Sequence, residues 1–201
     1  DAYLESLAER DDVIALGFHV DYWDYIGWKD TYASPEFTQR QRDYAASLGA
    51  RYVYTPQMVI QGAADAVGSE KRKVEWKIRA ARKIPQLKVG LAYDAKTQTV
   101  TLSVPASPIR ESHAVLLAVY DDAAPTEITR GENTGRTITY AHPVRKLKTL
   151  GAWQGQALSL PIALSELRVD KEAPYACAVL LQSQETGRIL GTASLELAAG
   201  Q

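Results

Sequence analysis

The sequence predicts an α/β unit followed by an all-β unit. In roughly the first 84 residues, helical and strand patterns alternate. After that point, short strand-like runs are separated by turn residues, and Pro85 marks the change because it ends a charged helical segment. We therefore expect two domains, residues 1–84 and residues 85–201, with the second arranged as an immunoglobulin-like β-sandwich of unknown role.

The composition excludes several classes of protein. With 201 residues, 46% of them apolar and 23% charged, the chain is expected to fold as an ordinary globular protein. A net charge of -1 creates no overall field toward polyanions, so no nucleic-acid partner is predicted. No apolar stretch approaches the roughly 20 residues of a membrane-spanning helix, so no span is expected. Nothing in the residue pattern indicates a cofactor.

The first unit has clear helix and strand signals. A helix is expected over residues 1–10, and the almost continuous apolar run of residues 13–20 predicts a strand covered on both faces, as in a parallel sheet. The next helix has Ser34 as N-cap, Pro35 in its first turn and Gly49 at its end.

Two short strands, residues 51–55 and 57–61, are expected on either side of Pro56. Ser69 is then expected to cap a last helix. That helix carries seven cations: Lys71, Arg72, Lys73, Lys77, Arg79, Arg82 and Lys83. A solvated basic face, favoured near the negative end of the helix dipole, is the preferred interpretation over a nucleic-acid site.

The second unit reads as a series of short strands. The expected strands are residues 87–93, 98–104, 114–120, 137–140, 157–160, 176–182 and 189–197. The segment from Arg130 to Arg136 has the glycines of a loop. Its charged residues could bind an anion or the first unit, although loop-stabilising contacts are the favoured interpretation.

A single cysteine, Cys177, excludes an internal disulfide and every multi-cysteine metal motif. It lies in the apolar run of residues 175–181, which predicts a buried strand and an inert thiol. The sequence also has no Gly-x-Ser-x-Gly motif, so nothing indicates a hydrolase.

The most unusual stretch is the loop of residues 21–32, where five aromatic residues alternate with three aspartates. It follows an expected strand end, so it is either a wall of a substrate groove or a lid over the core, and both interpretations stay open. His19, Asp21 and Asp24 have side chains that suit a divalent cation, but a hydrogen-bonded histidine at the strand end is the favoured hypothesis, and no metal is predicted.

Three segments carry a resemblance to a known family. The stretch YTPQMVIQG, residues 54–62, resembles the part of thioredoxin-like domains in which a cis-proline precedes a strand. Residues 19–30, Thr55–Met58 and Arg130–Arg136 together resemble a bacterial family of secreted thioredoxin-like proteins known by a domain-of-unknown-function label. Pro56 read without the resemblance is a trans proline at an edge strand.

The resemblance implies a thioredoxin-like fold without its first strand and the start of its first helix. It places a Cys-x-x-Cys just before Asp1, so no catalytic residue is expected in this chain. The longer parent protein would then be a thiol-disulfide oxidoreductase, exported to the periplasm or secreted.

The resemblance also implies a partner, namely an extended peptide or a thiol-bearing protein. The substrate-binding residues expected on this basis are Thr55, Pro56, Tyr54, Trp23, Trp28, Asp21, Asp24 and His19. The alternative function is a non-catalytic peptide- or protein-binding module that uses a groove at Pro56 together with the β domain. Enzymatic activity is therefore an open question at the level of the sequence.

Overall fold

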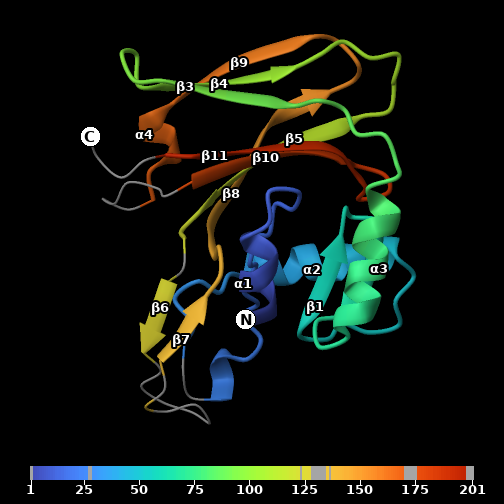
Figure 1. The fold of residues 1–201 in the computed structure, drawn as a ribbon, viewed down its shortest axis with the longest axis vertical. Coiled ribbons are helices and arrows are strands. Elements are labelled where there is room, and N and C mark those ends of the chain that lie inside the picture. Colours follow the sequence, from blue (N-terminus) through green and yellow to red (C-terminus); the bar gives the residue numbers. More distant parts are fainter. Residues whose placement is uncertain are drawn as a thin grey trace.

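A computed structural model describes residues 2–26, 29–122, 124–127, 135, 137–169 and 176–197 (Figure 1). The helical elements are α1 (Ala2–Ala8), η1 (Asp24–Ile26, a 3-10 helix), α2 (Pro35–Ser47), α3 (Lys71–Ala81) and α4 (Leu164–Leu167). The strands are β1 (Gln57–Ile60), β2 (Ala64–Val67), β3 (Gly90–Asp94), β4 (Thr99–Val104), β5 (His113–Tyr120), β6 (Ala124–Glu127), β7 (Thr137–Tyr140), β8 (Val144–Trp153), β9 (Leu158–Ala163), β10 (Ala176–Ser183) and β11 (Ile189–Glu196).

Two antiparallel sheets hold most of the core. The first has the strand order β11-β10-β5-β8 and the second the order β3-β4-β9. One face of the first sheet packs against the second sheet around the fully buried Trp153, Leu117 and Leu181. Burial of apolar side chains from both sheets is the main stabilising contribution to this region.

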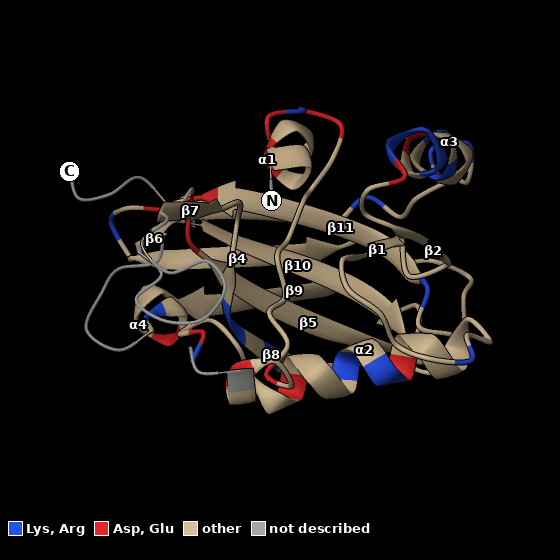
Figure 2. Ribbon diagram, turned by 90° about the horizontal axis from the view of Figure 1, so that it is seen from below, with Lys and Arg blue, Asp and Glu red and all other residues tan. Residues whose placement is uncertain are grey.

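The other face of the four-stranded sheet is covered by the N-terminal part of the chain (Figures 1 and 2). Three residues on β5 and β10 that face this side, Ala118, Ala176 and Ala178, are small, and they pack in one cluster with Phe37 of α2. Because β5 and β10 are covered on both faces, they are almost continuously apolar.

The predicted fold class is wrong. Within the described residues, the segment 13–20 belongs to no sheet and makes only single parallel bridges, Gly17 with Pro143 and His19 with Ala33. The strands of the first part are one antiparallel hairpin, β1 with β2. The part of the chain that the structure describes therefore has no parallel α/β sheet of the thioredoxin-like kind, and no immunoglobulin-like domain following one.

The reason for the error lies in what surrounds the 13–20 segment. Its apolar residues alternate between two different cores: Val13 and Ala15 pack against α1 and α3, whereas Leu16 and Phe18 pack with Phe37 on the four-stranded sheet. A segment that lies between two cores needs apolar side chains on both sides, as a central strand does. The sequence pattern alone does not distinguish these two situations.

The proposed boundary near residue 84 stays a prediction, but residues before and after it are in close contact. Gln182 of β10 donates a hydrogen bond to the Tyr44 hydroxyl of α2 at 2.9 Å, and this bond is buried. The backbone N–H of Ile189 donates to the carbonyl of Gln61 at 2.9 Å.

The helix signals are partly confirmed. Ser34 caps α2 by accepting a hydrogen bond from the Glu36 N–H at 3.2 Å, and Gly49 follows the helix with φ +68°. Ser69 is not the cap of α3, because that position is taken by Glu70 without a side-chain cap bond.

Besides residues 13–20, strands differ from expectation at four places. Residues 51–55 form no strand, while β2, β6 and β8 were not anticipated. In β8, lysines and glycine interrupt the apolar alternation. Among the described residues β8 is the last strand of its sheet: one edge pairs with β5, and the start of the other edge bonds to Gly17 through the N–H of Val144. Lysine on an unpaired edge discourages pairing with another chain.

Candidate functional site

The aromatic loop and the segment before β1 meet at one exposed surface. The indole Nε1 of Trp23 donates a hydrogen bond to the Thr55 hydroxyl oxygen at 3.3 Å. Trp23 is 48% exposed, and its ring lies 5.5 Å from that of Tyr22. The peptide bond between Thr55 and Pro56 is cis, in agreement with the family resemblance.

Tyr54 is held by a polar cluster beneath this surface. Its hydroxyl donates to Oδ2 of Asp65 at 2.6 Å, and the Gln57 amide donates to the same oxygen at 2.9 Å. Burial and the hydrogen bond to Asp65 raise the pKa of Tyr54. Burial acts to raise the pKa of Asp65, but the bonds from Tyr54 and Gln57 outweigh it and the pKa is lowered.

Gln41 of α2 connects the aromatic loop to Tyr54. Its Oε1 accepts from the Tyr22 hydroxyl at 2.9 Å, and its Nε2 donates to the Tyr54 carbonyl at 2.8 Å. One amide side chain therefore bridges two segments that lie 32 residues apart. This bridge holds the loop in place beside Thr55.

The backbone of Thr55 is left free. Thr55 and Pro56 are both exposed, and neither the N–H nor the C=O of Thr55 has a hydrogen-bond partner within the described part of the chain. Regular pairing with β2 begins at Gln57, the first residue of β1. On the inner side, the N–H of Gly68 donates to the Pro56 carbonyl at 2.8 Å, and a Cβ at Gly68 would lie 3.2 Å from the Pro56 ring.

Further aromatic side chains extend the surface. Tyr52 is 73% exposed and its ring lies 6.4 Å from that of Tyr54. Single exposed apolar residues are ordinary, but several aromatic rings around a free backbone segment indicate a contact surface. We call the set Trp23, Tyr52, Tyr54, Thr55 and Pro56 the Thr55 surface.

The two predicted aspartates support the loop and do not reach Thr55. Asp21 accepts a hydrogen bond from the buried Thr38 hydroxyl of α2 at 2.6 Å, while its own N–H donates to the same hydroxyl oxygen. Asp24 accepts from the N–H of Asp30 at 3.3 Å. Their role here is to anchor and turn the loop.

His19 points into a different cluster. Its Nδ1 lies 2.6 Å from Oδ2 of Asp30, and its ring packs edge-on against Tyr140 at 4.5 Å. The Tyr32 hydroxyl donates to Asp121 at 3.1 Å. Burial, and then nearby carboxylates, raise the pKa of both Tyr32 and Tyr140 to about 12.

The remaining predicted residues lie elsewhere. Trp28 and nearly all of the Arg130–Arg136 loop fall outside the described residues. Cys177 is fully buried between the sheets, and burial raises the pKa of its thiol to about 11. A thiol with such a pKa is protonated at neutral pH and is no nucleophile.

The described residues offer neither a metal site nor a membrane-spanning helix. No group of three or more His, Cys, Asp or Glu side chains there is arranged to hold a metal ion. In the same part of the chain, each helix is too short or too polar to cross a bilayer.

Sequence reasoning missed Gln41, Gln57 and Asp65. Asp65 had a usable signal, because a carboxylate within a short strand next to β-branched and small residues needs a partner. The sequence had no comparable signal at Gln41, since a glutamine on a helix is normally solvated. One acceptor, Oε1 of Gln57, is buried without a hydrogen-bond partner among the described residues.

Comparison with known proteins places the chain in a family. The family model described as "Protein of unknown function (DUF1223)" matches residues 1–182. The chain is also similar to a crystal structure of protein AGR_C_4864 from Agrobacterium tumefaciens, with 26% identity and a TM-score of 0.82 over 100% of this chain and 88% of that one. No curated protein matches. The expected domain-of-unknown-function label is thus confirmed, and this chain belongs to the DUF1223 family.

Proposed function

We propose that the Thr55 surface binds an extended peptide segment of a partner protein. The observation that carries this proposal is that Thr55 is an exposed residue whose backbone N–H and C=O have no hydrogen-bond partner in the described part of the chain. An extended chain laid beside Thr55 forms main-chain hydrogen bonds with it, as in strand addition, whatever the side chains of that peptide. Such binding is tolerant of sequence, and it suits a partner that is unfolded or has an exposed terminus.

The aromatic side chains supply the contact area. Trp23 and Tyr52 present large rings with few rotatable bonds, so their ordering on binding costs little entropy. Trp23 is oriented by its bond to Thr55, and the 54–55 segment is oriented by Gln41. A surface that is already ordered before binding loses less free energy when the peptide arrives.

The polar residues under the surface favour binding over catalysis in this chain. At neutral pH Tyr54 is protonated and Asp65 is charged, and the hydrogen bond between them, which raises the pKa of Tyr54 and lowers that of Asp65, reinforces both states. Both side chains are hydrogen-bonded to each other. This pairing stabilises the segment and leaves neither group free to act as a base.

Thiol-disulfide exchange by a longer parent protein, in the periplasm or outside the cell, is a second proposal that rests on the family resemblance. A peptide-binding surface supports it, because an oxidoreductase must hold its protein substrate. The test is insulin reduction by this chain and by a chain extended upstream. Activity only in the extended form, lost on changing an upstream cysteine to serine, supports exchange; inactivity of both with intact thiols rejects it.

The binding proposal is tested with reduced, carboxymethylated α-lactalbumin as an unfolded probe. We expect saturable binding by fluorescence anisotropy, and slower hydrogen exchange at the Thr55 N–H when the probe is bound. Trp23→Ala with Tyr52→Ala lowers the affinity at least tenfold, whereas Tyr93→Ala, which removes a 41% exposed tyrosine on β3, leaves it unchanged. Absence of binding, or equal loss in both variants, overturns the proposal.

A further inference from the structure

We propose that the outer face of α3 and of the turn that follows it, formed by Arg72, Trp76, Arg79 and Lys83, binds the surface of an anionic phospholipid bilayer. This inference does not depend on peptide binding at the Thr55 surface. It concerns attachment to the surface, with the helix lying flat on the headgroups and nothing crossing the membrane.

The first observation is the concentration of charge on α3. Residues 71–83 contain seven Lys and Arg residues and one acidic residue, Glu75, so the segment carries +6. The whole chain carries -1, and the rest of it therefore carries -7. The near-neutral net charge of the whole chain therefore conceals a strongly basic helix on an otherwise acidic protein. Figure 2 shows α3 at the periphery of the molecule, with basic residues around much of its circumference.

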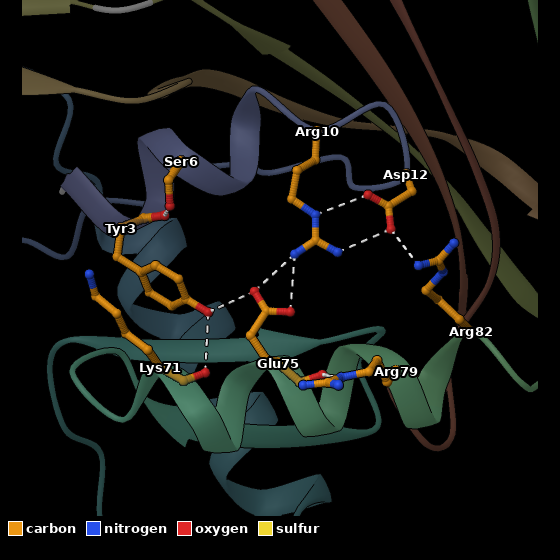
Figure 3. Close-up of polar contacts among 8 residues, drawn as sticks. All are labelled: Tyr3, Ser6, Arg10, Asp12, Lys71, Glu75, Arg79 and Arg82. Atoms are coloured by element: carbon orange, nitrogen blue, oxygen red, sulfur yellow. Dashed lines mark hydrogen bonds and ion pairs between the residues drawn. The ribbon is translucent and has the colours of Figure 1, made fainter.

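The second observation is that the inner face of α3 is tied to the N-terminal segment (Figure 3). The Arg10 guanidinium donates to Glu75 at 2.9 Å and to Asp12 at 3.0 Å, and Arg82 pairs with Asp12 at 2.8 Å. Val74, further along the inner side, is buried against α1. These contacts neutralise the inward charges and set which side of the helix faces out.

The third observation is that the cations of the outer face lack counter-charges. Arg72 and Lys83 have no side-chain partner among the described residues, and Arg79 donates only to the Glu75 carbonyl at 3.4 Å. These residues and Trp76 recur at intervals of three and four, which places them on one stripe of a helix. Trp76 is 66% exposed at the centre of that stripe.

The combination of residue types favours a lipid surface over an acidic protein. Tryptophan partitions to the interface between water and acyl chains, where its ring is buried and its N–H stays hydrated. Long cationic side chains reach from there to the headgroups. Ile84, 44% exposed after the helix, adds apolar area. Because Arg72 and Lys83 are exposed and have no side-chain partner among the described residues, they are available to lipid headgroups.

The test measures binding to vesicles of phosphatidylcholine with 40% phosphatidylglycerol and to vesicles of phosphatidylcholine alone. We expect binding to the anionic vesicles that falls steeply between 50 and 500 mM NaCl. Each juxtamembrane cation contributes roughly a fivefold factor to partitioning, so Arg72→Gln with Lys83→Gln lowers it about thirtyfold. The matched control, Lys96→Gln with Arg168→Gln, removes the same charge from exposed sites elsewhere and leaves partitioning within about twofold.

A separate set of variants tests the contribution of Trp76 to vesicle binding. Trp76→Ala weakens vesicle binding, Trp76→Phe retains most of it, and brominated lipids quench the emission of the wild type more than that of Trp76→Phe. Circular dichroism and urea unfolding confirm that each variant is folded. No binding to the anionic vesicles, equal losses in the two charge-matched variants, or binding to polyglutamate without binding to vesicles each overturns the proposal.

Discussion

Trp23 and Thr55 are joined by a hydrogen bond of 3.3 Å from the indole Nε1 to the threonine hydroxyl oxygen. They belong to segments that are separated by the whole of α2. The bond places a half-exposed aromatic ring beside a free backbone segment, and Gln41 supports the same arrangement from α2. The Thr55 surface is thus assembled by tertiary contacts between the loop, α2 and the start of β1.

This bond makes the Thr55 hydroxyl a test of the surface. Thr55→Val removes the acceptor for the Trp23 indole at nearly constant shape, and we expect about a fivefold loss of affinity for the unfolded probe, equivalent to one hydrogen bond of about 1 kcal/mol. Thr55→Ser keeps the acceptor and serves as the control. Equal affinities for the two variants would contradict an orienting role for the bond.

The hydrogen bond between Tyr54 and Asp65 is expected to stabilise the start of β1. Tyr54→Phe removes a charge-assisted bond from partly buried groups, so the free energy of unfolding should fall by about 1–2 kcal/mol in urea titrations. Tyr52→Phe, which changes an exposed tyrosine with no such bond, should cost less than about 0.5 kcal/mol. A similar loss in both variants would show that the bond contributes nothing.

The hydrogen bond between Tyr54 and Asp65 also predicts how the stability of the fold depends on pH. The pKa of Asp65 is lowered in the folded chain from its ordinary value of 3.8, so the folded state favours the charged carboxylate. Its contribution to stability is present above that ordinary value and is lost as the pH falls through the lowered pKa. We expect Asp65→Asn to be less stable than wild type at pH 7, with the difference shrinking below about pH 4. A stability difference between Asp65→Asn and wild type that is constant from pH 7 to pH 2.5 would contradict this prediction.

Alanine substitutions at two glycines with the same backbone conformation distinguish the cost of local backbone strain from the cost of a clash between distant segments. Gly49 and Gly62 have φ +68° and +61°, so alanine is strained by about 1 kcal/mol at either position. A Cβ at Gly49 meets nothing within 4 Å, whereas one at Gly62 would overlap the Gly187 carbonyl oxygen.

Gly62→Ala should therefore lower the free energy of unfolding by clearly more than Gly49→Ala, because the β1–β2 turn must move away from the segment before β11. Urea unfolding of both variants measures the difference. Equal destabilisation would mean that the turn and the Gly187 segment are not packed together in solution.

Local signals in the sequence predicted several elements correctly. The start of α2 follows from Ser34 and Pro35, and its end from Gly49, because capping and positive φ depend on residues adjacent in the chain. The strands β4, β5, β10 and β11 follow from runs of β-branched and apolar residues. The burial of Cys177 follows from such a run.

The candidate site was predictable in part. The aromatic loop and the Tyr54–Pro56 segment stood out in the sequence, and Trp23 does meet Thr55. The partners that hold them, Gln41 and Asp65, did not stand out, because an isolated polar residue in a helix or hairpin has no signature of what it will contact.

The sequence by itself determined the composition, the positions of most helices and strands, and the family. Only the tertiary structure decided that residues 13–20 lie between two cores instead of inside a sheet, and that the four-stranded sheet carries α2 on its outer face. It also decided which side of α3 has no counter-charges among the residues that the structure describes. The physical reason is that secondary structure responds to neighbours along the chain. The partner of an apolar or charged face is chosen by long-range packing, and many partners satisfy the same pattern.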